Sequence, residues 1–373
     1  MFNISLMLFV AFSGVYLWQS GLPQLSHLVI LFTSTIFISK VKTIPFTKSY
    51  LFLFAFLIYS FVINFYYFVI YEDLQFIISS IQVFFNFYLL IIVVGILGKI
   101  DNAYSSIVFG VVIGYTIQWF VLLFGFGNYT LYPRYSGTFN DPNQMAFWLL
   151  STYSIFLSLK DRVKINNYFS IFLHLSFLIF IAMTISRSAI LAIVFFTVVF
   201  FLWKILKSNK IYFFLLSLLV LLFLSIVPLF LQHTSDNIVL DRLTNLELEK
   251  QADERGYTRF SEYPEYTILG SGQGEHKRFN SKKDPDFLNV EMHTTWGGLL
   301  FYYGLFGFIS IAIFLLTVLV KVSSFNRIVL LSTFVYGIST YSFRTPIFWF
   351  LLAVFISIGL TMRKENNNLI NNK

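Results

Sequence analysis

The sequence contains no cysteine and very little charge. Without cysteine, no disulfide can staple the fold and no thiolate can serve as a nucleophile or metal ligand. Only 12% of the 373 residues are charged, compared with roughly 25% in an ordinary soluble domain, while 57% are hydrophobic and 20% are aromatic. A water-soluble fold cannot hide so much apolar surface, so a soluble globular protein is excluded.

Long apolar stretches recur along the whole chain. Runs of about 17 to 25 apolar residues are long enough to cross a bilayer as helices, and they do not alternate as the strands of a β-barrel do. Residues 1–20 lack a basic leader and a cleavage pattern, so we expect a retained first helix. We predict an all-α polytopic membrane protein of about twelve transmembrane helices, at 4–18, 27–39, 49–70, 74–97, 104–126, 145–159, 168–184, 188–203, 211–231, 295–320, 327–342 and 346–362.

These helices divide the chain into four parts. Residues 1–231 hold helices one to nine, 232–294 form one large loop, 295–362 hold the last three helices and 363–373 form a tail. The loop carries twelve acidic and eight basic residues, the densest polarity in the chain. We expect function to concentrate at that loop and at the helix ends beside it.

The distribution of positive charge predicts the orientation. With the N-terminus in the cytoplasm, fifteen of the 26 Lys and Arg residues fall in cytoplasmic segments, and only Arg134, Arg187 and Arg344 fall in short outer connections. Short cytoplasmic segments are enriched in basic residues, so both termini are predicted to be cytoplasmic and the loop periplasmic. This bias accounts for the sequence pI of about 9.4 without a nucleic-acid partner.

Four polar clusters lie at the predicted outer helix ends. The first is RYSGTFNDPNQMAFW, residues 134–148, which contains Arg134, Asp141 and Asn143; an Asx turn that starts a helix would also explain it. The second is TISRSAI, residues 184–190, where Arg187 occupies a tight connection. Alternatively, the side chain of Arg187 only extends toward water at the membrane surface.

The other two clusters flank the end of the large loop. ERGYTRFSEYPEYTILGSGQGE, residues 254–275, has two arginines four residues apart and then glycines at alternate positions. Alternate glycines are found in phosphate-binding loops, but the strand–loop–helix context is missing. EMHTTWGGLLFYYGLFG, residues 291–307, places Glu291 and His293 just before a helix, where a structural histidine is the alternative.

Metal sites are not indicated by the sequence. Asp284-Pro285-Asp286 has the Asp-x-Asp form that many sugar-nucleotide transferases use for a divalent metal, but the predicted loop faces away from the nucleotide pool. His27 and His174 occur singly on apolar helices, without metal-ligand spacing. We expect them to make polar contacts between helices, and we expect neither a metal nor a cofactor.

The order of the clusters carries more information than any one of them. One predicted helix is preceded by R-x-S-G-T-F-x-D-P-N, and another starts with S-R-S-A. The large loop then contains R-G-Y and Y-P-E-Y-x-x-x-G-x-G-x-G. The last two motifs are E-x-H-T-T and Y-G-x-x-G. This order, over about residues 134–307, resembles the O-antigen ligase and polymerase superfamily. The R-G-Y and E-x-H forms are most similar to its Wzy-type repeat-unit polymerases.

The resemblance implies a GT-C-like glycosyltransferase in the bacterial inner membrane, with its active site on the periplasmic face. The implied substrates are oligosaccharides on undecaprenyl diphosphate, and the product is an O-antigen or capsule polysaccharide. Membrane lipid, a chain-length regulator and a flippase are the implied partners. Arg187, Arg255 and His293 match the family's arginines and loop-end histidine, with Arg259 as a second candidate for the loop arginine.

The chemistry of such a transfer suggests roles for these side chains. Guanidinium groups suit the charge that develops on a departing diphosphate, so Arg187 and Arg255 are predicted to stabilise it. A sugar hydroxyl needs a base, and His293, with Glu291 second, is predicted to activate it. We expect substrate binding by Arg134, Asp141, Asn143, Arg259, Gly270, Gly272, Glu275 and Arg278.

Two other functions compete with polymerisation. A ligase of the same superfamily moves finished polysaccharide from the same carrier to lipid A core, and its donor site would share these motifs. A transporter or flippase would place ionisable residues near the middle of the bilayer, often on broken helices. The predicted helix interiors here are almost free of charge, which disfavours transport.

Overall fold

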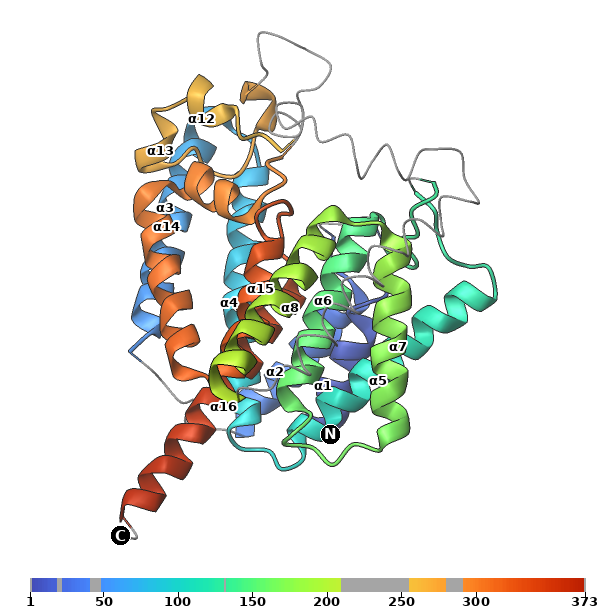
Figure 1. Ribbon diagram of the computed structural model, residues 1–373. Coiled ribbons are helices and arrows are strands. Elements are labelled where there is room, and N and C mark those ends of the chain that lie inside the picture. Colours follow the sequence, from blue (N-terminus) through green and yellow to red (C-terminus); the bar gives the residue numbers. More distant parts are fainter. Residues whose placement is uncertain are drawn as a thin grey trace.

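The chain is almost entirely helical in the computed structural model, which describes residues 2–18, 22–40, 48–130, 132–208, 255–279 and 291–371. These residues form no strand, and their one β-type pairing is an isolated bridge between Asn128 and Gly137. Figure 1 shows the helices, which are α1 (Phe2–Phe12), α2 (Leu25–Lys40), α3 (Tyr50–Tyr71), α4 (Gln75–Leu97), α5 (Ala103–Leu123), α6 (Pro142–Leu159), α7 (Asn167–Thr184), α8 (Arg187–Ser208), α12 (Arg259–Glu262), α13 (Tyr266–Leu269), the 3₁₀ turn η1 (His276–Phe279), α14 (Thr295–Lys321), α15 (Ser324–Tyr336) and α16 (Pro346–Asn371).

Seven of the described helices are long and apolar enough to cross a membrane, namely α3, α4, α5, α7, α8, α14 and α16. The helices α1 and α2 are apolar but shorter. Apolar side chains also cover outward faces: Val69 of α3 is 62% exposed and Leu206 of α8 is 86% exposed. Lipid is the solvent that such faces require. The chain is therefore a multi-pass helical membrane protein, as predicted.

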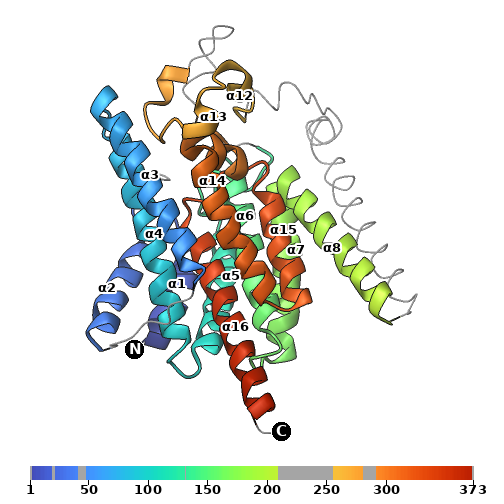
Figure 2. The same cartoon turned by 90° about the vertical axis from the view of Figure 1, so that its left-hand side faces the viewer.

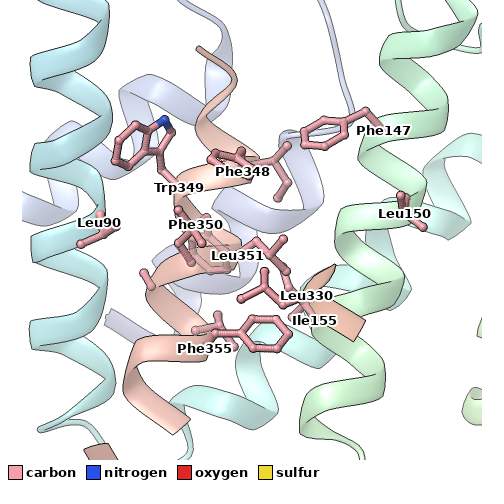
Figure 3. Close-up of a cluster of buried hydrophobic side chains, with 14 of the residues drawn as sticks. Leu90, Phe147, Leu150, Ile155, Leu330, Phe348, Trp349, Phe350, Leu351 and Phe355 are labelled. Atoms are coloured by element: carbon pink, nitrogen blue, oxygen red, sulfur yellow. The ribbon is translucent and has the colours of Figure 1, made fainter. Parts of the chain in front are cut away.

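The helix α16 lies in the centre of the bundle. It packs against α4 on one side and α6 on the other, and it also contacts α14. Figure 3 shows Trp349 and Phe350 of α16 between Leu90 of α4 and Leu150 of α6, all of them buried. Because lipid chains are as apolar as these side chains, the packing gains its stability from close van der Waals contact.

The two ends of the bundle differ in composition. Figures 1 and 2 show α12, α13 and the connection between α15 and α16 at one end, which we call the loop end. The start of α1 and the end of α16 lie at the opposite end, which we call the tail end. Every residue predicted to bind substrate or to act in catalysis, where it is described, lies near the loop end of its helix or in the segments there.

Two predicted helices end six residues earlier than expected. The first was predicted to reach Trp18 but ends at Phe12, because Gly14 packs against Trp148 and its carbonyl accepts the side-chain amide of Gln118 at 2.8 Å. The eleventh was predicted to reach Ser342, but α15 ends at Tyr336. The predicted ninth helix, 211–231, and residues 232–254 of the loop lie outside the described residues.

The carbonyl of Gly337 explains the early end of α15. It accepts the backbone N–H of Thr295 at 2.8 Å. A continuing helix would need that carbonyl for the residue four positions later. At the other end of the chain, α16 continues to Asn371 through most of the predicted tail.

Candidate functional site

The connection between α15 and α16, residues 337–345, gathers polar groups from distant parts of the chain. We call it the α15–α16 linker. Thr295 at the start of α14 donates its hydroxyl to the Thr340 carbonyl at 2.6 Å. Asn86 of α4 donates its amide to the Arg344 carbonyl at 2.9 Å. These bonds fix the linker against two helices, so its side chains are held in defined positions.

Ser339 of this linker joins three segments predicted to be catalytic. Its hydroxyl is hydrogen-bonded to that of Ser188, the residue after Arg187 at the start of α8. Its carbonyl accepts a hydrogen bond from the Arg255 guanidinium, and the Arg255 carbonyl accepts the N–H of His293 at 3.3 Å. We call the group formed by these five residues the junction.

The start of α6 is anchored beside the junction. Asp141 caps α6 by accepting the N–H of Asn143 at 2.7 Å, which is the Asx-type helix start considered from the sequence. The side-chain oxygen of Asn143 accepts from Arg134 at 2.8 Å and from Ser186 at 3.1 Å. Arg134 is only 2% exposed and also donates to the Thr184 carbonyl at 3.0 Å. These residues position the start of α8 against α6.

Glu291 is bonded through both of its carboxylate oxygens. One oxygen lies 2.6 Å from a guanidinium nitrogen of Arg344, and the other accepts the side-chain amide of Gln273 at 2.7 Å. The amide oxygen of Gln273 in turn accepts the hydroxyls of Tyr303 at 2.8 Å and Tyr341 at 3.1 Å. Because both oxygens have partners, the carboxylate of Glu291 is fixed in position and can orient neighbouring groups.

The segment Gly270–Gly274, which we call the glycine turn, packs where α14 is broken. Gly304 has a φ of 61° and a ψ of −174°, which interrupts the helix. The carbonyls of residues 301 and 302, just before the break, accept the N–H groups of Ser271 and Gly272 at 2.9 Å each. The turn thereby supplies hydrogen bonds that a broken helix in an apolar environment requires.

Two glycines permit this contact between backbones. A Cβ atom on Gly270 would lie 2.6 Å from the carbonyl oxygen of Tyr302, and one on Gly304 would lie 2.3 Å from that of Ile268. Both glycines also have positive φ angles. Only glycine combines that backbone conformation with so close an approach.

The amides of the glycine turn are bonded within the protein. Besides the two amides that reach α14, Gly270 donates to the Tyr266 carbonyl and Gln273 to the side-chain oxygen of Asn64, each at 2.8 Å. The N–H of Glu275 donates to Asp73 at 2.6 Å. Phosphate binding by these glycines stays a prediction, and the geometry accounts for them through packing.

Arg278 and Arg259 are held by aromatic rings. The guanidinium carbon of Arg278 lies 4.5 Å from the ring centre of Phe279 and 4.7 Å from that of Tyr67. The same group donates to the Gly272 carbonyl at 3.2 Å. Arg259 is 6% exposed and lies 5.2 Å from the Phe279 ring centre. Cation–π contacts of this kind fix the loop to α3.

His293 is exposed to solvent, although protein surrounds much of its ring. Restricted access to water lowers the pKa of His293; the negative charge of Glu291 opposes this shift and the positive charge of Arg344 adds to it. His293 is therefore mainly neutral near pH 7, and a neutral imidazole is the form that can accept a proton.

His276 of η1 is a second neutral histidine at the loop end. Burial lowers the pKa of His276 to about 4, and its ring packs against Tyr302 with ring centres 5.8 Å apart. Glu291 and Arg344 lie close enough to affect its charge. A weakly basic, buried imidazole suits a hydrogen-bonding role better than proton transfer.

Several residues of the site were not predicted from the sequence. They are Asn64, Gln273, His276, Ser339 and Arg344. A signal for the α15–α16 linker was present, because the polar run S-T-Y-S-F-R-T leads into Pro346 and such a run favours a connection over a helix.

The two single histidines make structural contacts. Nδ1 of His174 on α7 is hydrogen-bonded to the hydroxyl of Tyr153 on α6 at 2.7 Å, the interhelical contact that was predicted. Nδ1 of His27 accepts the N–H of Gln24 at 2.9 Å, a local contact three residues away and not the interhelical polar contact that was predicted. Across the described part of the chain, no three His, Asp or Glu side chains are grouped to hold a metal. Residues 284–286 lie outside that part.

The fold and the site together define a multi-pass helical membrane protein with its polar network at one end of the bundle. No protein-family model matches the sequence, and no curated protein matches it.

Proposed function

We propose that this protein is a membrane glycosyltransferase that polymerises lipid-linked oligosaccharide repeat units, as its motifs suggest. The donor is a glycan chain on undecaprenyl diphosphate, and the acceptor is a hydroxyl on the next lipid-linked unit. The observation that carries this proposal is the junction. Arg187, Arg255 and His293 come from three separate segments, and hydrogen bonds through Ser339 bring these segments together.

The arginines suit the donor half of the reaction. The transfer breaks the bond between an anomeric carbon and a phosphate oxygen, and negative charge develops on the diphosphate that leaves. Arg187 and Arg255 are half-buried, so their charge is less screened than it would be in bulk water. Placed at a helix end, such groups meet a diphosphate whose lipid anchors it in the bilayer surface.

His293 suits the acceptor half. Its imidazole is neutral near pH 7 and reaches solvent, so it can take the proton of an incoming sugar hydroxyl. Glu291 is engaged by Arg344 and Gln273. In this proposal His293 is the base, and Glu291 tunes its pKa while fixing the segment in which both residues lie.

The membrane arrangement that we propose has twelve spans and a GT-C-like architecture in a bacterial inner membrane. The helices α1 to α8 and α14 to α16, together with the predicted helix 211–231, supply that number. The start of α1 and the end of α16 lie at the same end of the bundle, which agrees with two cytoplasmic termini and a periplasmic loop end.

Transport is supported less well than glycosyl transfer. The break in α14 at Gly304 is a feature that transporters share. Here the carbonyls beside the break bind the glycine turn instead of facing a substrate path. The ionised pair of Glu291 and Arg344 lies outside the helices, at the loop end.

The direct test is reconstitution of the reaction. Purified full-length protein is mixed with undecaprenyl-diphosphate-linked repeat units, and products are separated on a gel. A ladder of chain lengths without any other enzyme is the expected result. Transfer that requires added lipid A core and gives no ladder would identify the ligase instead. Uptake of the lipid-linked unit into vesicles without any transfer would reject both glycosyltransferase functions.

A further inference from the structure

A cavity of about 540 Å³ opens at the tail end, away from the junction. It lies where α6, α8 and α16 approach their ends and α15 begins. Nothing in the proposed glycosyl transfer uses this region.

The cavity is lined by an excess of positive charge. Lys160, Arg162 and Lys204 line it together with one carboxylate, Asp161. Lys160 is exposed, whereas Arg162 and Lys204 are half-buried. Ser323 caps the first turn of α15 at the cavity wall by accepting the N–H of Asn326 at 3.3 Å. The positive end of that helix therefore adds to the attraction for an anion.

Aromatic and aliphatic side chains also line the cavity. Phe200 and Trp203 of α8 line the cavity, and the ammonium group of Lys204 lies 5.4 Å from the Trp203 ring centre. On the same helix, Leu202 and Leu206 are 55% and 86% exposed. Cationic heads beside an apolar, lipid-facing helix, with a tryptophan between them, are typical of the headgroup level of a bilayer.

We propose that this cavity binds the phosphate headgroup of an anionic phospholipid. Lys160, Arg162 and Lys204 contact the phosphate, and the apolar side chains of α8 lie along the acyl chains. The predicted orientation places this end in the cytoplasmic leaflet, which carries the negative surface potential in bacteria and other cells. A soluble phosphate would use the same cations but would gain nothing from the exposed apolar face of α8.

The test counts bound lipids on the purified full-length protein. Native mass spectrometry is carried out in detergent after addition of phosphatidylglycerol, phosphatidylcholine or inorganic phosphate. Wild-type protein is expected to retain phosphatidylglycerol in preference to the other two. The double variant Lys160→Gln/Lys204→Gln should lose affinity for it by about 30-fold, since each basic group near an anionic lipid contributes about fivefold.

Lys164→Gln is the matched control, because Lys164 lies in the same connection but does not line the cavity. It should bind phosphatidylglycerol as the wild type does. If the double variant fails to give a monodisperse protein, Arg162→Gln replaces it, with about a fivefold loss expected. The proposal would be overturned if control and cavity variants lost affinity for phosphatidylglycerol equally, or if neither lost affinity. It would also be overturned if inorganic phosphate bound as tightly as phosphatidylglycerol.

Discussion

The glycine turn and the junction lie at the same end of the bundle and use similar residues in different ways. At the glycine turn, backbone amides, two glycines and Arg278 are bonded to other parts of the protein. At the junction, Arg187 and Arg255 are half-buried and His293 is exposed. The first region holds the loop on the helices, and the second is where, in the proposed function, a substrate meets charged groups.

Dense polarity therefore does not by itself mark a binding site. The glycine-rich run is the most motif-like stretch of the loop, yet its amides are bonded to α3, to the connection between α3 and α4, and to α14. Substitutions at the glycine turn should therefore reduce stability, whereas substitutions at the junction should reduce activity.

Gly304→Ala should destabilise the protein most. The new Cβ would lie 2.3 Å from the Ile268 carbonyl oxygen, and the backbone there has a φ of 61°. Strain and overpacking together should cost about 4 kcal/mol. Thermal melting in detergent measures the loss, with Gly98→Ala as the control, because a Cβ at Gly98 meets no atom closer than 3.4 Å. A Gly304→Ala protein as stable as that control would contradict the packing.

Arg187→Ala and Arg255→Ala should each reduce chain elongation by about 10²- to 10³-fold, because in the proposed reaction each removes a cationic donor for the departing diphosphate. Both variants should accumulate in the membrane and melt within a few degrees of the wild type. The chain-length ladder is the measurement. Arg363→Ala, the same substitution at the exposed tail end, is the control. Full-length polymer from both junction variants would contradict the catalytic roles of Arg187 and Arg255.

Arg278→Ala should lower stability by about 3 kcal/mol, since it removes bonds to two carbonyls and a stack of aromatic contacts. Arg278→Lys should recover only part of this, because an ammonium group lacks the planar fork. Lys277→Ala, the exposed neighbour, serves as the control in the same melting experiment. If Arg278→Ala protein lost elongation activity but kept its stability, that result would support the predicted substrate-binding role of Arg278.

Glu291→Gln should have the smallest effect and should appear in the pH profile. Glu291 raises the pKa of His293, so its neutralisation should lower that pKa further. A base must be neutral to act, so elongation falls as the pH drops through the pKa of His293, and the variant should keep its activity to lower pH than the wild type. Glu265→Gln, at the N-cap of α13, is the control. A shift of the acid limb to higher pH would contradict the role of His293.

The helical framework could be predicted from the sequence in most places, because long apolar runs have one stable form in lipid. The structure has helices in place of every predicted one that it describes, and α4 ends at Leu97 as expected. The linker after α15 was missed because Phe334 and Tyr336 continue the apolar pattern, which outweighed the polar run that follows. The contact of Gly337 with Thr295, which joins residues far apart in the sequence, helps to end the helix.

The site was predicted only as separate motifs. The family resemblance pointed to the arginines and His293, but it does not say that Ser339 links their segments. Nor does it separate Arg255 from Arg278, whose guanidinium lies against the rings of Tyr67 and Phe279. Bonds such as that between Gln273 and Asn64 join residues 209 positions apart, and local patterns contain no information about them.

The break in α14 also determines how the loop can move. Lifting the glycine turn would leave the carbonyls of residues 301 and 302 without the donors that Ser271 and Gly272 now provide. In an apolar environment each orphaned carbonyl costs several kcal/mol. The turn and this part of α14 are therefore one cooperative unit, and the loop opens only if the helix rearranges with it.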